Sequence, residues 1–398
     1  MYTREDVLTY VEEEDVKFIR LAFVDLYGTQ KNIAIMPEEL KRAFSEGIPF
    51  DSCNIDGFNK YVLSDLYLHP DPSTLSILPW RPSDGRVVRM FCNVTYPDGT
   101  PFEGDSRSIL QAAIETAAGN GLECTFGNET EFYLFKTDED GEPTQLPFDN
   151  AGYLDIAPED KGENVRREIC FTLSDMGIIP ESSHHEAGPG QNEVDFKYSD
   201  PLTAAEDAIT LRSVIKTIAM RNGLYADFSP KPLENQSGNG MHINISVVAT
   251  NGEDELRSFM AGILAHIEEI TFFLNPTEES YRRFGEKKAP IYITWSSENR
   301  NQLIMIPETS KKRKHLKLRS PDSGANPYIA YALLIYAGLD GVRNKMDPGE
   351  PTNLDLFDDS EAPAGLKKLP LTLEKARDLA LSSSFVKDIL GEDYLALF

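Results

Sequence analysis

The sequence predicts an α+β protein in two domains, on three observations. Apolar side chains alternate with a strand period over the first hundred residues, whereas later residues mix helical and strand patterns. Between these parts, residues 95–108 read TYPDGTPFEGDSRS, with two Pro and two Gly, a composition typical of a boundary. The length of 398 residues also exceeds what one hydrophobic core usually supports. We therefore expect domains at 1–100 and 101–398.

The first domain is expected to contain two strands separated by a proline-rich loop stretch. In KFIRLAFVDLYG, one face of the first strand is formed by Ile19, Leu21 and Phe23. In RVVRMFCNV, one face of the second strand is formed by Val88, Met90, Cys92 and Val94. Each pattern predicts a strand with one side buried.

The second domain contains a predicted helix that begins near residue 203. Thr203 and Glu206 have the spacing of a capping box, and Gly223 supplies the stop. The predicted buried stripe of this helix consists of Ile209, Leu211, Val214, Ile215 and Ile218.

Composition excludes several classes of protein. Lys and Arg number 39 and Asp and Glu 65, so the net charge is 39 − 65 = −26, which argues against binding nucleic acid or anionic membranes. No apolar stretch approaches a membrane span, and the N-terminal residues lack a signal-peptide pattern. The four cysteines are too scattered for a disulfide framework or a zinc ribbon. We expect a cytoplasmic protein.

Three segments carry acidic or imidazole groups on one strand face. Glu129 and Glu131 share a face in GNETEFYLF, and His242 shares one with Asn244 and Ser246 in GNGMHINISV. In HHEAGPGQNEVDF, a Gly-Pro-Gly turn separates the carboxylates of Glu186 and Glu193, so a hairpin return would bring them together.

Each of these faces, taken alone, is interpreted most simply as solvated. Three such strands together favour convergence, and converging carboxylates need cations because like charges at short range do not all stay ionised. Oxygen-rich ligands with one imidazole suit Mg²⁺ or Mn²⁺ better than zinc. This combination suggests phosphate chemistry, and no P-loop sequence is present.

A basic region follows in ESYRRF, SSENRNQ and SKKRKHLKLRS. It contains Arg282, Arg283, Arg300, Lys312, Arg313 and Arg319. Either these side chains form an exposed basic strip, or arginines grip a substrate carboxylate and a transferring phosphate. The spacing leaves both interpretations open.

The chain resembles class I glutamine synthetases over essentially its whole length. The motifs that carry the resemblance include PDGTPFEGDSR, GNETEFYLF, SHHEAGPGQNEVDFKY, PKPLENQSGNGMHINIS, NPTEESYRR and APIYITWSSENR. The resemblance implies an N-terminal β-grasp domain, then a catalytic domain of antiparallel sheet with helices. It also implies homo-oligomeric rings, hexamers or dodecamers, with sites completed between subunits.

The reaction implied by the resemblance is ATP-dependent formation of γ-glutamyl phosphate from glutamate, followed by attack of ammonia. By motif position, the first metal would be held by Glu131, Glu186 and Glu193, and the second by Glu129 and His242. Glutamate would be bound by Ser237, Gly238, Arg283 and Arg319. Positions similar to ATP contacts are Glu181, Phe196, Lys197, Tyr198, Asn244, Ser246 and Lys312. Arg300 would lie near the γ-phosphate, and Asp51 would help to deprotonate ammonium from the adjacent subunit.

Three positions depart from the family pattern. Lys288 in GEKKAP stands where the family flap has a glutamate that receives ammonium protons, and Lys317 stands in place of a second-metal glutamate. Met305 replaces a phosphate-binding arginine. An ammonium beside Glu129 would be favourable and would compete with Mg²⁺.

Three functions remain open on these residues. The first is a ligase that joins glutamate, or a related carboxylate, to ammonia or a primary amine. The second is a non-catalytic paralogue with a binding or regulatory role. The third is a single-metal γ-glutamyl hydrolase. The intact carboxylate set and both gripping arginines favour the ligase.

Overall fold

A computed structural model describes residues 2–81, 84–286, 288–307, 314–357 and 362–398. The chain divides into two compact units. The smaller comprises Met1–Ile109, Phe171–Ile178 and Glu392–Phe398, and the larger comprises Leu110–Cys170 and Ile179–Gly391. The chain therefore enters the smaller unit three times, at its N-terminal part, at Phe171–Ile178 and at Glu392–Phe398.

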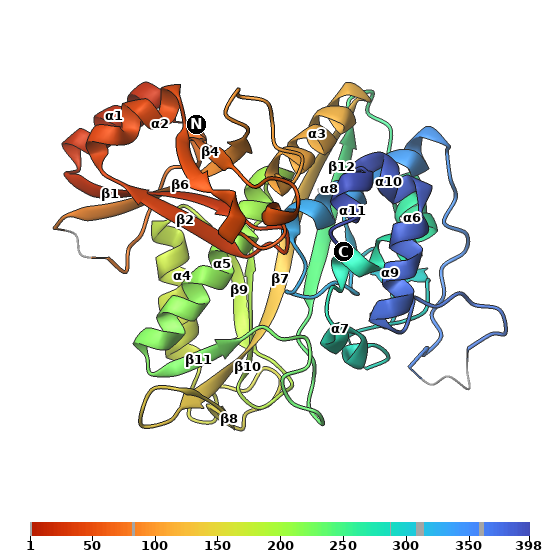
Figure 1. The fold of residues 1–398 in the computed structure, drawn as a ribbon. Coiled ribbons are helices and arrows are strands. Elements are labelled where there is room, and N and C mark those ends of the chain that lie inside the picture. Colours follow the sequence, from red (N-terminus) through yellow and green to blue (C-terminus); the bar gives the residue numbers. More distant parts are fainter. Residues whose placement is uncertain (1, 82–83, 287, 308–313, 358–361) are drawn as a thin grey trace. The chain divides into compact units, whose positions relative to one another are not determined.

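The smaller unit is built on a sheet of order β2-β1-β6-β4-β3, with β5 paired to β6 (Figure 1). Its strands are β1 (Val16–Val24), β2 (Gln30–Ile35), β3 (Ile48–Asp51), β4 (Asp65–Pro70), β5 (Ser76–Ile77) and β6 (Arg86–Thr95), with helices α1 (Arg4–Glu13) and α2 (Leu40–Ser45). β1 runs parallel to β6 and antiparallel to β2. The two strands predicted from alternation are confirmed as β1 and β6, and their apolar faces are buried in one core.

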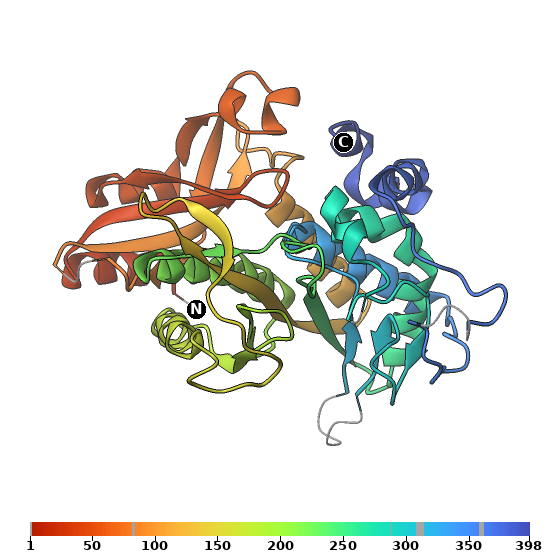
Figure 2. The same ribbon diagram turned by 90° about the horizontal axis from the view of Figure 1, so that it is seen from below.

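The larger unit contains a sheet of order β13-β14-β15-β12-β7-β10-β9, with β8 and β11 also paired to β7. Its strands are β7 (Leu122–Thr137), β8 (Pro143–Pro147), β9 (Pro180–His185), β10 (Gln191–Phe196), β11 (Leu224–Asp227), β12 (Met241–Ala249), β13 (Trp295–Ser296), β14 (Ile304–Met305) and β15 (Leu316–Leu318). Among the described strands of this sheet, only the β13–β14 pair is parallel. The long strand β7 runs through its middle (Figure 1 and Figure 2).

The remaining helices of the chain are α3 (Ser106–Gly119), α4 (Glu163–Asp175), α5 (Pro201–Arg221), α6 (Leu256–Leu274), α7 (Glu278–Arg283), α8 (Pro327–Arg343), α9 (Leu373–Ser382), α10 (Ser384–Leu390) and α11 (Glu392–Leu395). Helices α6 and α8 pack closely because small residues face each other. A Cβ at Gly341 would lie 2.1 Å from the carbonyl oxygen of Ser258 and 2.6 Å from the backbone nitrogen of Gly262. Glycine is therefore required at this crossing.

The predicted helix after residue 200 is α5, but its predicted capping box is wrong. The N-cap is Asp200, whose carboxylate accepts a hydrogen bond from the backbone N–H of Thr203. Pro201 then occupies the first helical position, which its fixed φ favours. The predicted apolar stripe is buried, and Gly223, with φ of +69°, follows the helix as expected.

The register of the larger sheet aligns the polar side chains of neighbouring strands. On β7, Glu129 lies opposite His242 of β12 and opposite Asp195 of β10. Glu131 lies opposite Glu193. Since alternate residues of a strand face the same side, this register places Glu129, Glu131, Glu193 and His242 on one face of one sheet.

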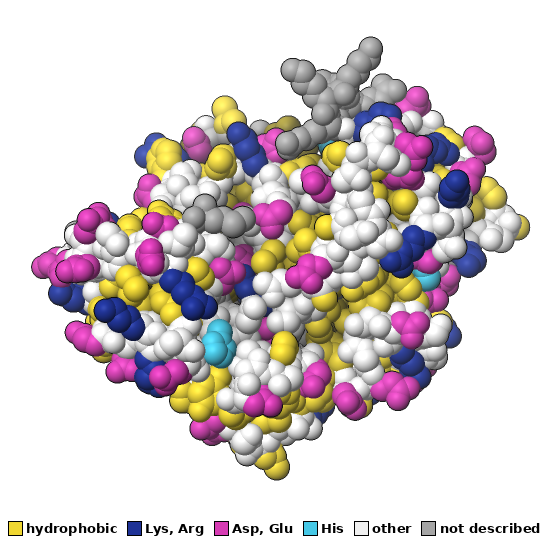
Figure 3. Space-filling view, turned by 90° about the horizontal axis from the view of Figure 1, so that it is seen from above, with side chains coloured by type: hydrophobic (Ala, Val, Ile, Leu, Met, Phe, Trp, Pro, Cys, Tyr) yellow, Lys and Arg dark blue, Asp and Glu magenta, His cyan; other side chains and the backbone are white. Residues whose placement is uncertain are grey.

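Acidic side chains on the face shown in Figure 3 are interspersed with Lys and Arg rather than gathered into one patch. None of the helices in the described ranges is long and apolar enough to cross a membrane.

Candidate functional site

A polar pocket of about 550 Å³ opens over the aligned face of the larger sheet. Its charged lining consists of Glu129, Glu186, Glu193, Asp195 and Asp355 with Lys288, Arg300, Lys317 and Arg319. Two imidazoles, those of His184 and His242, also line it. A pocket with both signs of charge at close range is suited to binding small ionic molecules.

A tight turn brings Glu186 next to Glu193. The backbone N–H of Glu186 donates to the carbonyl oxygen of Gln191, which closes the Gly-Pro-Gly turn. A Cβ at Gly188 would lie 1.9 Å from the hydroxyl oxygen of Tyr133, so only glycine fits. The structure thus brings together the two carboxylates that the hairpin pattern placed near each other.

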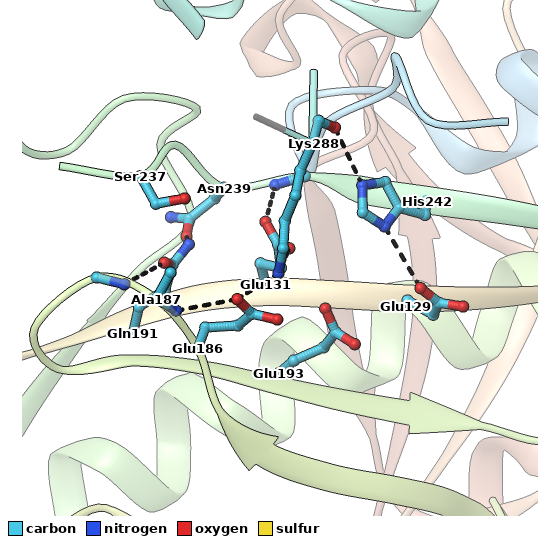
Figure 4. A network of polar contacts seen from close by, with 12 residues as sticks. Glu129, Glu131, Glu186, Ala187, Gln191, Glu193, Ser237, Asn239, His242 and Lys288 are labelled. Carbon is cyan, nitrogen blue, oxygen red and sulfur yellow. Dashed lines mark hydrogen bonds and ion pairs between the residues drawn. The ribbon is translucent and has the colours of Figure 1, made fainter. Parts of the chain in front are cut away.

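Lys288 forms ion pairs with two carboxylates of this group. Its Nζ lies 3.4 Å from Oε1 of Glu131 and also contacts Oε2 of Glu186. Figure 4 shows the lysine side chain extending toward these glutamates from the opposite side of the site. Burial alone would raise the pKa of Glu186, but the hydrogen bond with His184 and the ammonium of Lys288 lower it to about 2.

Glu129 is held by a second lysine and by two neighbours on β12. Lys317 forms an ion pair with Oε1 of Glu129, and the side-chain amide of Asn244 donates to the same oxygen at 3.1 Å. Nδ1 of His242 lies 3.3 Å from Oε2. These contacts lower the pKa of Glu129 despite its burial, which by itself would raise it. Glu129 is therefore a stable anion.

Glu193 and Asp195 form no ion pair with either lysine in the part of the chain that the structure describes. Burial, together with the charges of Asp195 and Glu131, raises the pKa of Glu193 well above its usual value. Burial and the charge of Glu129 raise the pKa of Asp195 to about 7. Glu193 and Asp195 therefore bind a proton more readily than ordinary carboxylates do.

The carboxylates have the right chemistry for Mg²⁺ or Mn²⁺, but the site as it stands does not fit two such ions. Of the four glutamates expected to bind metal, Glu129, Glu131 and Glu186 each contact a lysine ammonium. Oε2 of Glu131 also accepts a hydrogen bond from the backbone N–H of Gly240 at 2.7 Å. Two sets of three side chains in the site still have potential metal-ligand atoms within 4.8 Å of one another. One is Glu129 with Glu193 and His242, and the other is His184 with Glu186 and Glu193.

The arginines predicted to bind substrate differ in their surroundings. Arg283 is fully buried and donates to the carbonyl oxygens of Ser320 and Pro321. Arg319, unlike Arg283, lines the pocket, and its buried Nε, like that of Arg283, has no hydrogen-bond partner among the described residues. Arg300 is exposed and also lines the pocket. Arg319 and Arg300 are therefore the guanidinium groups available to an anionic ligand.

The other predicted ligand-binding positions are spread around the sheet. Gly238 packs against Arg283, where a Cβ would lie 2.6 Å from Cγ of the arginine, and the Ser237 carbonyl oxygen accepts a hydrogen bond from Tyr133 at 2.6 Å. The hydroxyl of Ser246 donates to the carbonyl oxygen of Lys314. Residues of this group outside the pocket lining are Glu181, Phe196, Lys197, Tyr198, Ser237, Gly238, Asn244 and Ser246.

The two remaining predicted residues are Lys312 and Asp51. Lys312 lies outside the described residues. Asp51 belongs to the smaller unit, where its carboxylate accepts hydrogen bonds from the backbone N–H of Cys53 at 2.8 Å and the side chain of Asn54 at 2.6 Å. Its predicted role from an adjacent subunit stays a prediction.

Sequence reasoning missed several residues that line the pocket, among them His184, Asp195 and Tyr153. His184 lies 3.1 Å from Glu186 and stands opposite Glu193 on β9. Asp195 continues the alternation that begins at Glu193, so the strand period could have found it. Tyr153 packs edge-to-face on His184 from a loop, and no sequence pattern indicates that contact.

The fold and the site together define a class of protein with an N-terminal β-sheet unit and a second sheet unit that carries a carboxylate-lined pocket. The glutamine synthetase β-grasp domain matches residues 15–97, and the glutamine synthetase catalytic domain matches residues 103–398. The chain belongs to the glutamine synthetase family.

Several relatives match nearly the whole chain. A glutamine synthetase of Methanosarcina mazei is 44% identical over 98% of this chain and 91% of its own length. One of Clostridium saccharobutylicum is 41% identical over 98% and 92%. The solved GmaS/ADP complex has a TM-score of 0.89 at 28% identity, over 98% of this chain and 94% of that one. A Plasmodium falciparum glutamine synthetase, at 22% identity and a TM-score of 0.87 over 100% and 94%, shares the fold.

Proposed function

We propose that this protein is an ATP-dependent ligase that forms a γ-glutamyl amide from glutamate, or a related carboxylate, and ammonia or a primary amine. The reaction would pass through γ-glutamyl phosphate. The observation that carries the proposal is that Arg319 and Arg300 line the same pocket as a row of carboxylates in a glutamine synthetase catalytic domain. The carboxylates of this lining are those of Glu129, Glu186, Glu193, Asp195 and Asp355.

The pocket offers cationic groups for both anionic substrates. Arg319 is 6% exposed and its buried Nε lacks a partner among the described side chains, so binding a substrate carboxylate would satisfy it. Arg300 is exposed at the rim and is free to contact a phosphoryl group. The ADP in the related GmaS complex supports a nucleotide site on this fold. We propose ATP as co-substrate on the same basis.

Mg²⁺ or Mn²⁺ is proposed to enter as the complex with ATP. Magnesium commonly binds through one or two carboxylates plus the substrate phosphates, and it neutralises charge on the transferring phosphoryl group. Within this chain, Lys288 and Lys317 hold the glutamates in place, while Arg319 orients the substrate carboxylate. The protein is further proposed to act in the cytoplasm as a homo-oligomeric ring, because that is the arrangement that the family resemblance implies.

The test is ADP release from purified protein with ATP, Mg²⁺ and glutamate, with ammonium compared against a panel of primary amines. Release that depends on an amine supports the ligase and identifies the acceptor class. The Arg319→Met variant should lose this activity, whereas Arg221→Met, an exposed arginine of α5, should retain it. Absence of release with every amine, from folded protein, contradicts the proposal.

One observation favours a second candidate, the non-catalytic paralogue. Two ammonium groups lie on carboxylates that the family resemblance assigns to metals. Saturable binding of ATP and glutamate by calorimetry, without release of ADP under any condition, would favour this binding role over the ligase.

A further inference from the structure

Three glutamates in the row of carboxylates at the larger sheet are neutralised from within the chain, whereas Glu193 and Asp195 have no lysine partner among the described residues. Glu131 and Glu186 share the ammonium of Lys288, and Glu129 has the ammonium of Lys317. Each lysine side chain is mostly buried, with exposed fractions of 28% for Lys288 and 17% for Lys317. Ammonium groups in such a position cannot be treated as solvated surface charges, because burial weakens the screening of their ion pairs.

The backbone around Lys288 is arranged to aim its side chain at the glutamates. Its φ is +75°, a left-handed conformation that is rare for residues other than glycine and costs free energy. Its carbonyl oxygen lies 3.4 Å from Nε2 of His242, and its ammonium lies 5.2 Å from the ring centroid of Tyr153. Strained backbone of this kind persists where the surrounding contacts determine it.

Lys317 is fixed by the sheet itself. It lies on β15 between β12 and β14, opposite Asn244 on one side and Met305 on the other. Because Met305 is apolar, it places no further positive charge beside the ammonium of Lys317, which pairs with Glu129. The two lysines therefore reach the same row of carboxylates from separate parts of the chain.

We infer that Lys288 and Lys317 are built-in cations, which occupy the oxygen positions that divalent metals would otherwise use, so that the folded site needs no resident metal ion. A divalent ion bound by the same oxygens would have to displace an ammonium and remain close to it. Mg²⁺ also requires near-octahedral coordination at short distances, which oxygens already engaged by ammonium groups do not offer. The inference concerns the protein without nucleotide and does not depend on the ligase activity.

The experiment measures metal binding directly. Mn²⁺ is titrated into nucleotide-free protein, and free Mn²⁺ is followed by electron paramagnetic resonance. The natural chain is compared with Lys288→Met, Lys317→Met and the double variant. Lys367→Met, which removes an exposed lysine paired with Glu268 at 3.5 Å, is the matched control. We expect at least tenfold tighter Mn²⁺ binding in each site variant, and no change in the control.

A second measurement uses the natural chain alone, so it stands even if a variant does not fold. Its Tm should be unchanged by EDTA and by added Mn²⁺, because no metal contributes to folding. Tight binding of two Mn²⁺ by the natural chain, or a Tm lowered by EDTA, would overturn the inference. Variants that bind Mn²⁺ no better than the natural chain would also overturn it. Neither result touches the assay for ADP release, so failure of this inference is distinguishable from failure of the ligase proposal.

Discussion

Lys317 on β15 reaches past the intervening strand β12 to form an ion pair with Glu129 on β7. This pair neutralises a carboxylate that lies at the centre of the sheet, where Asn244 and His242 also contact it. Removal of either partner would leave an unpaired charge that is mostly buried, so we expect the pair to affect both stability and ligand binding.

Replacing Lys317 should destabilise the fold. The Lys317→Met variant is expected to lose about 2–3 kcal/mol of unfolding free energy, because Glu129 would remain as a mostly buried charge without its cation. Urea denaturation at neutral pH measures the loss. Lys314→Met is the control, since its pair with Asp254 is exposed and should contribute less than about 1 kcal/mol. Equal losses in both variants would contradict the prediction.

Stability should fall as the pH rises toward 8, in part through Asp195. Burial and the charge of Glu129 raise its pKa from 3.8 to about 7. Between these values the folded state holds a proton that the unfolded chain has released. The contribution is therefore fully present below pH 3.8 and is lost as the pH rises through about 7.

The Asp195→Asn variant tests this dependence because it removes the titrating group and keeps the shape. Unfolding free energies from urea titrations at pH 5, 6, 7 and 8 should decline less steeply in the variant than in the natural chain. Glu13→Gln, an exposed change on α1, should leave the slope unaltered. An unchanged slope in Asp195→Asn would show that this carboxyl does not titrate in the range.

The crossing of α6 and α8 should not tolerate a methyl group. Gly341→Ala is expected to cost about 2–3 kcal/mol, because its Cβ would lie 2.1 Å from the carbonyl oxygen of Ser258. Gly119→Ala is the matched control. It lies in α3, where an added Cβ meets nothing within 4 Å, and it should stabilise the protein by about 0.5 kcal/mol. Similar Tm shifts for both variants would contradict the packing argument.

Arg319 should govern affinity for the carboxylate substrate. Arg319→Lys keeps the charge but loses the planar pair of donors, and it is expected to raise the KM for glutamate by about 10- to 100-fold. Initial rates of ADP release at varied glutamate concentrations measure the effect. An unchanged KM in Arg319→Lys, with the exposed Arg221→Lys as reference, would place the substrate carboxylate elsewhere.

The sequence predicts the positions of strands better than the residues at which helices begin. Alternating apolar residues located β1 and β6 because burial on one side imposes a period of two. The same period placed Glu129 and Glu131 on one face of β7. The cap of α5 was assigned to Thr203 rather than Asp200, because several adjacent residues have side chains able to cap and only the backbone geometry selects one.

The sequence by itself determined the family, the two-part α+β organisation and the set of carboxylates, because motifs and strand periods are local properties of the chain. Tertiary structure decided how those groups are compensated. Register across separate strands set Lys317 beside Glu129, and a left-handed backbone at Lys288 set its ammonium between Glu131 and Glu186. The family resemblance already placed Lys317 near Glu129, and the structure shows this ion pair. The contacts of Lys288 with Glu131 and Glu186 join residues far apart in sequence, and no local pattern encodes them.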